Sequence, residues 1–128
     1  MQKRTFSIID MCMGWLAFTI AAITYCLTIE PTASLWDCSE FITCGYKLEI
    51  GHPPGAPFFM LMANLFSQFA SSPSEVARMV NLLSALLSAG CILFLFWTIT
   101  HLVRRLIVSD DDYSIRKVIL IESCGIVG

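Results

Sequence analysis

The sequence predicts an all-α integral membrane protein, and three observations lead to this fold class. Charged residues make up 14% of the 128 residues and hydrophobic residues 56%, whereas soluble domains carry roughly 25% charged residues. The mean hydropathy is +0.72. The apolar residues also gather in two long runs without Asp, Glu, Lys or Arg, at positions 11–29 and 79–103. About 20 apolar residues cross the hydrocarbon core of a bilayer, so both runs are predicted to be transmembrane helices.

The first predicted span covers about residues 8–29. Lys3 and Arg4 precede it, so a cleaved signal peptide is an alternative. The apolar run is longer than the roughly 7–15 residues of a signal-peptide core, and no convincing cleavage site follows it. We therefore favour a retained span. Asp10 is expected at its inner edge, where an exposed carboxylate costs little.

Residues 30–78 form the loop between the two spans and are predicted to hold two short helices. Residues 36–48 contain no proline and make the first. The turn Gly51-His52-Pro53-Pro54-Gly55 ends it, because proline cannot continue a helix and extends the residue before it. Residues 56–70 make the second, which would measure roughly 22 Å. That is too short to cross a bilayer, so this helix is expected at the outer interface with its apolar face in lipid.

The second span, predicted at about 79–103, is preceded by Ser72-Pro-Ser-Glu75, which has the pattern of a capping box with proline at the first helical position. A cytoplasmic turn is expected at 104–117. The apolar segment 118–128 is interpreted as the start of a third span in a longer polytopic protein, because half a span leaves backbone groups unsatisfied in lipid. A small three-helix protein with a short last helix is the alternative.

Basic residues set the expected orientation, since Lys and Arg concentrate on the cytoplasmic side of membrane proteins. Six of them flank the two spans on the sides away from the loop, whereas the loop itself contains Lys47 and Arg78. The flanking residues are Lys3, Arg4, Arg104, Arg105, Arg116 and Lys117. The N-terminus is therefore predicted to be cytoplasmic and residues 30–78 extracytoplasmic.

The sequence offers few signs of metal or nucleic-acid chemistry. The six cysteines show no CxxC spacing, and the two histidines are predicted on opposite sides of the membrane, so no metal site is predicted. Cys38 and Cys44 both face the oxidising side, but a helix would place them on different faces, which disfavours a disulfide. No phosphate-binding glycine motif and no basic patch for nucleic acid is present.

Four residues of the loop are candidates for a functional site: Asp37, Glu40, His52 and Arg78. In a helix, residues three apart share a face, so the two carboxylates are expected side by side. Taken singly, each has an ordinary interpretation. Loop carboxylates are usually hydrated, a histidine beside prolines is often a turn residue, and an arginine at this depth can extend toward the lipid headgroups.

The order of these features resembles a known family. Asp-x-x-Glu at Asp37 and Glu40, then His-Pro-Pro-Gly at 52–55, an apolar helix and Arg-x-x-Asn-Leu from Arg78 resemble the start of the GT-C membrane glycosyltransferases. More closely, they resemble domain of unknown function family 2723, whose animal relative is a protein O-mannosyltransferase. The resemblance covers roughly residues 20–128. Cys38 departs from the small residues usual between the two acids.

The resemblance implies a GT-C-type fold and a reaction. Such enzymes move a sugar from a polyprenyl-phosphate donor to an acceptor hydroxyl, here a protein Ser or Thr, on the extracytoplasmic face. Asp37 would be the base, and Glu40 would hold the acceptor or orient the loop. His52, and more weakly Arg78, would contact the donor phosphate or sugar. The donor is a lipid-linked substrate, and no cofactor is predicted, although two carboxylates can bind a divalent metal.

The expected setting is a multi-pass protein of the bacterial inner (plasma) membrane, in contact with lipids, a protein acceptor and possible further membrane subunits. Two other functions stay open. A transporter or flippase of a lipid-linked precursor would place charges near the bilayer midplane, and the central halves of both spans lack them. A structural subunit of a membrane complex would use the loop for docking.

Overall fold

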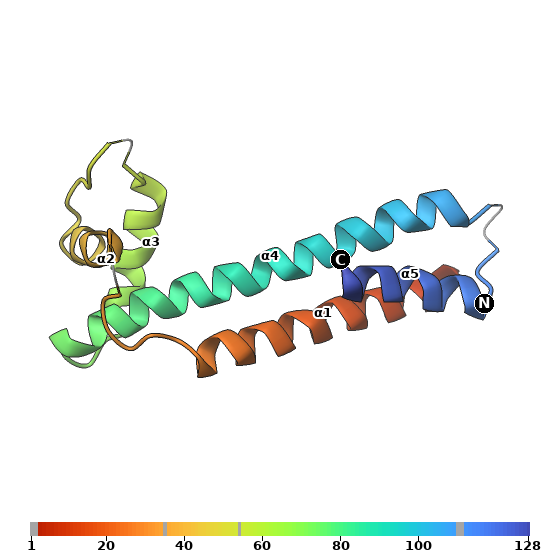
Figure 1. Cartoon of the computed structure of the whole chain (residues 1–128), viewed down its shortest axis with the longest axis horizontal. Coiled ribbons are helices and arrows are strands. Elements are labelled where there is room, and N and C mark those ends of the chain that lie inside the picture. Colours follow the sequence, from red (N-terminus) through yellow and green to blue (C-terminus); the bar gives the residue numbers. More distant parts are fainter. Residues whose placement is uncertain (1–2, 35, 54, 110–111) are drawn as a thin grey trace. The chain divides into compact units, whose positions relative to one another are not determined.

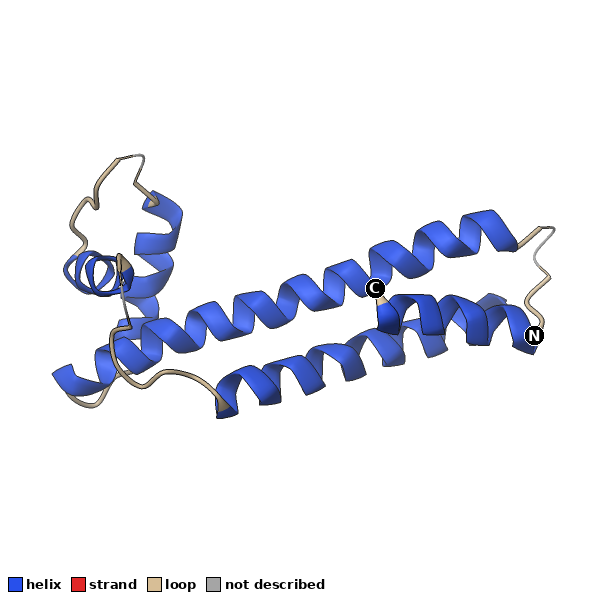
Figure 2. Cartoon of the chain, in the orientation of Figure 1, coloured by secondary structure: helices blue, strands red, loops and turns tan. Residues whose placement is uncertain are grey.

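The computed structural model describes residues 3–34, 36–53, 55–109 and 112–128. Its described residues are helical or in turns and loops, with no strand among them (Figure 2). The elements in chain order are α1 (Lys3–Leu27), α2 (Cys38–Lys47), α3 (Pro57–Ser67), the 3₁₀ helix η1 (Pro73–Glu75), α4 (Val76–Ile107) and α5 (Ile115–Val127) (Figure 1). Two stretches, Lys3–Leu27 and Pro73–Ile107, are long and apolar enough to cross a membrane.

Both long helices begin before the predicted spans, although α1 ends at Leu27, two residues short of position 29. Helix α1 begins five residues before the expected position 8, and α4 reaches past both ends of 79–103. Hydropathy marks the part of a helix that fits in lipid, whereas the hydrogen-bonded helix continues into its polar flanks. Arg104 and Arg105 lie in the last turn of α4, where cations interact favourably with the helix dipole.

The chain divides into two compact units. One unit, residues Tyr25–Leu87, contains α2, α3, η1 and the beginning of α4. Its core consists of Ile42 from α2, Ala63 from α3 and three residues of α4, namely Val76, Val80 and Leu83. Gly45 allows α2 to approach α3 closely, since a Cβ there would lie 2.7 Å from the Cβ of Ala63.

Both ends of α2 differ from the prediction of residues 36–48. Trp36 has a left-handed backbone with φ of 63°, which is costly for a bulky residue, so the helix begins after it, with Asp37 as N-cap. Leu48 is also left-handed, with φ of 55°, and its N–H donates to the carbonyls of Cys44 and Gly45. This arrangement ends a helix by satisfying its last carbonyl groups.

Two polar side chains of α3 are held by hydrogen bonds, one to α2 and one within α3. The Asn64 amide donates to the carbonyl of Tyr46 (2.9 Å), near the end of α2. Ser67 is buried and donates to the carbonyl of Asn64 (2.6 Å). Helix α3 ends at Ser67, short of the predicted position 70, because the next three amides bond to carbonyls three residues back.

The predicted capping box at Ser72 is wrong in its side-chain pattern. The Ser72 hydroxyl contacts the hydroxyl of Ser74 (2.9 Å) and accepts no amide of the helix. The Glu75 carboxylate accepts the amide of Ser71 (3.0 Å), one residue earlier than a capping box requires. The reason is that Pro73–Glu75 forms a tighter 3₁₀ turn, which changes the distances that a box on an α-helix needs.

The other unit, Met1–Thr24 with Ser88–Gly128, packs α1, the later part of α4 and α5 together. Phe6 of α1 stacks on Tyr113 at a centroid distance of 5.0 Å. Gly14 accommodates the indole of Trp97, and Gly125 lies against Thr100 and Phe96, so small residues let these helices approach. The Ser114 hydroxyl caps α5 by accepting the amide of Lys117 (3.4 Å).

Candidate functional site

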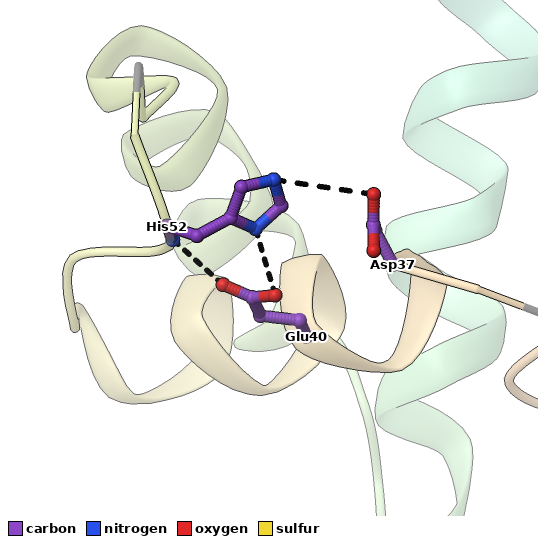
Figure 3. Close-up of side chains that lie close together, drawn as sticks. All are labelled: Asp37, Glu40 and His52. Carbon is purple, nitrogen blue, oxygen red and sulfur yellow. Dashed lines mark hydrogen bonds and ion pairs between the residues drawn. The ribbon is translucent and has the colours of Figure 1, made fainter.

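Three of the four predicted site residues come together in the unit formed by residues 25–87. Glu40 accepts two hydrogen bonds from His52, one from its backbone N–H (2.7 Å) and one from Nδ1 (2.9 Å) (Figure 3). The other ring nitrogen, Nε2, lies 4.0 Å from Oδ2 of Asp37. The imidazole therefore lies between the two carboxylates, bonded to one and facing the other.

The local chain geometry explains this arrangement. Asp37 is the N-cap of α2, and Glu40 lies in its first turn. The chain leaves α2 through the left-handed Leu48 and returns past Gly51, where a Cβ would lie 3.3 Å from the Glu40 carboxylate. The N–H of Gly55 donates to the carbonyl of His52 (2.9 Å) and closes the turn. Pro54, the second proline of the predicted turn, lies outside the described residues.

Exposure differs between the two acids. The Asp37 side chain is 59% exposed and makes no cap hydrogen bond to α2, whereas the Glu40 side chain is 37% exposed and is engaged by His52. Asp37 thus keeps oxygen atoms available to a ligand, while Glu40 acts on the turn that carries His52.

The Glu40–His52 contact shifts the titration of both groups. The hydrogen bonds from His52, first that of its backbone and then that of its ring, lower the pKa of Glu40. The hydrogen bond to Glu40, with smaller contributions from the charges of Glu40 and Asp37, raises the pKa of His52. Each partner therefore favours the charged form of the other.

The same residues are the ones that could bind a metal ion. Each of the three residues Asp37, Glu40 and His52 offers one ligand atom. These three atoms lie within 4.8 Å of one another. Carboxylate oxygen and imidazole nitrogen are ligands that several divalent cations accept. Metal binding would compete with the proton on His52, because a metal-bound imidazole nitrogen must be unprotonated.

Asn81 of α4 anchors the chain that leads to the site. Its amide donates to the carbonyls of Glu30 (2.9 Å) and Thr32 (3.1 Å). The thiol of Cys38, the first residue of α2, lies 3.9 Å from the Asn81 side-chain oxygen. The partners of Asn81 are backbone carbonyls of an irregular segment, which no spacing pattern in the sequence identifies.

Arg78 does not join the cluster. It is exposed on the first turn of α4, and no hydrogen bond or ion pair links it to Asp37, Glu40 or His52 in the described part of the chain. Cys38 and Cys44 are both free thiols, as the sequence argument favoured.

Comparison with known proteins identifies the family. Residues 37–128 match the family described as "Protein O-mannosyl-transferase TMEM260 N-terminal domain". The chain belongs to this family. The match begins at Asp37, the first residue of the cluster, and continues through α5, so the resemblance expected from the acid pair and the His-Pro-Pro-Gly turn is confirmed.

Two named relatives agree with this family. The mouse "Protein O-mannosyl-transferase TMEM260" is 36% identical over 85 residues, which are 66% of this chain and 12% of the relative. The Dictyostelium discoideum protein of the same name is 28% identical over 85 residues, 66% of this chain and 10% of the relative. The chain thus spans a small part of these relatives. Both are eukaryotic, so they give no support to the expected bacterial inner membrane. No solved structure matches the chain.

Proposed function

We propose that this chain contributes the acid–base part of a membrane glycosyltransferase that moves a sugar from a polyprenyl phosphate to a Ser or Thr hydroxyl of a protein. The observation that carries the proposal is the Asp37–Glu40–His52 cluster, which lies at the start of the region shared with the O-mannosyltransferase family. A GT-C-type fold for the whole protein is part of the same proposal, and the two long apolar helices are consistent with it.

Asp37 is proposed as the general base. The acceptor hydroxyl oxygen attacks the anomeric carbon of the donor, the bond from that carbon to the phosphate oxygen breaks, and the hydroxyl proton passes to the Asp37 carboxylate. A positioned base of this kind contributes typically 10²–10⁴-fold to the rate. Asp37 suits this role because its carboxylate is exposed and free of a capping hydrogen bond.

Glu40 is proposed as a positioning residue that acts through His52. Of the two roles expected for it, the two hydrogen bonds from His52 favour orientation of the loop over binding of the acceptor. Protonated His52 would stabilise the negative charge that develops on the departing phosphate, since fixed donors aimed at developing charge lower a barrier. Arg78 is at most a peripheral contact for the donor.

The site is proposed to lie at the extracytoplasmic membrane surface, with the N-terminus cytoplasmic. Helix α3 and the turn after it leave large apolar side chains exposed at helical spacing: Phe58, Leu61, Leu65 and Phe69. Such a stripe suits a helix that rests in the lipid interface. A lipid-bound donor and a soluble protein acceptor can both reach a loop at this depth.

The proposal is tested with the full-length protein, a polyprenyl-phosphate-linked mannose and a Ser/Thr peptide. Asp37→Asn should lower the transfer rate by about 10²–10⁴-fold, without loss of expression or membrane insertion. Glu49→Gln is the matched control, because it removes an exposed carboxylate of the same loop outside the cluster. Equal rates for wild type and Asp37→Asn would exclude Asp37 as the base. In a deletion strain, accumulation of the lipid-linked sugar on the cytoplasmic leaflet would indicate a flippase, whereas a strain with neither this accumulation nor a loss of protein-bound sugar would indicate a structural subunit.

A further inference from the structure

A second pair of acidic residues lies in the other unit. Glu122 of α5 is 7% exposed. Neither of its carboxylate oxygens has a hydrogen-bond partner among the described residues, and the same is true of Oδ1 of Asp10 on α1. Each residue is seven positions from the start of its helix, roughly 10 Å along the axis. Asp10 is therefore not the exposed edge residue that the sequence suggested.

Glu122 opens onto a cavity between α1 and α5. The cavity has a volume of about 420 Å³, and its walls are mainly aliphatic, with Ile9 and Met13 from α1 and Val118 and Ile119 from α5. Glu122 is the charged residue of the lining. A buried carboxylate without a partner is costly, and in a membrane span it usually marks a functional contact.

Protonation of Glu122 would remove its negative charge but would still leave its carboxyl group without hydrogen-bond partners in the described part of the chain. A protonated carboxyl needs an acceptor for its O–H and a donor for its carbonyl oxygen, and neither is within hydrogen-bond distance in the described part of the chain. A hard metal ion fits poorly as well, because calcium takes six to eight oxygen ligands and only Glu122 and Ser123 offer side-chain oxygen in a lining that is otherwise apolar. A group that satisfies Glu122 must therefore carry hydrogen-bond donors and a positive charge. Its remaining atoms must be apolar, so that they can contact the aliphatic side chains of the cavity.

We propose that this cavity receives a lysine or arginine side chain from another membrane helix of the protein. The methylene stem would lie along the aliphatic walls, and the cationic head would donate to the carboxylate of Glu122, near Asp10. In the mouse relative the matched region is a small part of the protein, and the chain covers 12% of it, so proteins of this family have further chain to supply such a residue. The pair would fix α1 and α5 to the rest of the membrane domain, independently of the transferase reaction.

Two cations of this unit already have partners, and Arg4, Arg105 and Arg116 are exposed rather than directed into the cavity lining. On α4, the guanidinium of Arg104 lies 3.4 Å from Nδ1 of His101 and 5.9 Å from the centroid of the Phe6 ring. Lys117 on α5 pairs with Asp112 at 2.7 Å. Asp10 is the charged group that acts on Glu122 from α1, and it adds negative charge, which strengthens the requirement for a cation.

The test is the melting temperature of full-length Glu122→Gln against wild type from neutral to acid pH. With a cationic partner, the variant should melt several degrees lower at neutral pH, because the partner loses its counter-charge. The difference should shrink in acid, as wild type loses the pair. Asp112→Asn is the control and should change little, since its salt bridge is exposed. A variant at least as stable as wild type at neutral pH would overturn the proposal.

A charge exchange gives an independent answer. Full-length Glu122→Arg is combined, one position at a time, with Glu in place of each lysine and arginine of the other membrane helices. One combination should recover most of the melting temperature lost by the single change. Failure of every combination would overturn the proposal. If Glu122→Arg alone does not fold, recovery of folded protein is itself the readout.

Discussion

Replacing Gly45 by alanine should disturb the packing that carries the acidic cluster. The added Cβ would lie 2.7 Å from the Cβ of Ala63, and ordinary contacts are 3.4–4 Å, so α2 and α3 would have to separate by roughly 1 Å. Overpacking of this kind costs about 1–3 kcal/mol, whereas alanine gains up to about 1 kcal/mol over glycine in a helix. The variant should therefore range from near neutral to about 2 kcal/mol less stable.

Gly90→Ala is the matched control, because a Cβ at Gly90 meets no atom within 4 Å and only the gain in helix propensity remains. The melting temperatures of the two full-length variants should differ, with Gly45→Ala the lower. Ala63→Gly in the Gly45→Ala background should recover part of the loss, since it removes the clashing methyl group. Equal stability of the two single variants, with no recovery in the double variant, would refute the close approach of α2 and α3.

Asn81→Leu removes an amide that donates two hydrogen bonds, so it should destabilise the full-length protein by about 1–3 kcal/mol and lower the transfer rate, as followed by melting temperature and activity assay. In a pH–rate profile, activity should fall as the pH rises through the pKa of His52, which Glu40 holds above its usual value; Glu40→Gln should shift this fall to lower pH. In a background without other reactive cysteines, Ser71→Cys should react with a membrane-impermeant thiol reagent outside intact cells, and Ser109→Cys should not.

Hydropathy and proline placement are local properties, so the structure has a helix near each place where the sequence predicts one, with ends that differ by up to five residues. The sequence places α2 two residues too early, since no propensity rule anticipates the left-handed backbone of Trp36. Spacing predicts that Asp37 and Glu40 share a face. It does not predict that His52 bonds to Glu40, because that contact depends on how the chain returns after Leu48.

Long-range contacts are the part that sequence reasoning could not supply. The bonds from Asn81 join residues about fifty positions apart and end on backbone carbonyls, which every residue possesses. Glu122 received no role, because one acid in a short apolar segment carries no spacing pattern. Only the packing of α1 against α5 shows that its carboxylate is buried and lacks a hydrogen-bond partner among the described residues.

The two acids of the cluster are close in sequence but differ in what they can do. Glu40 is committed to His52 through two hydrogen bonds, so a substitution there acts first on the imidazole. Asp37 faces the other side of the same ring at 4.0 Å and remains exposed. Loss of Glu40 and loss of His52 should therefore impair the same step, and their combined effect should be smaller than the product of the two single effects. Loss of Asp37 should add to either, because the proposed mechanism requires a proton acceptor in addition to the imidazole.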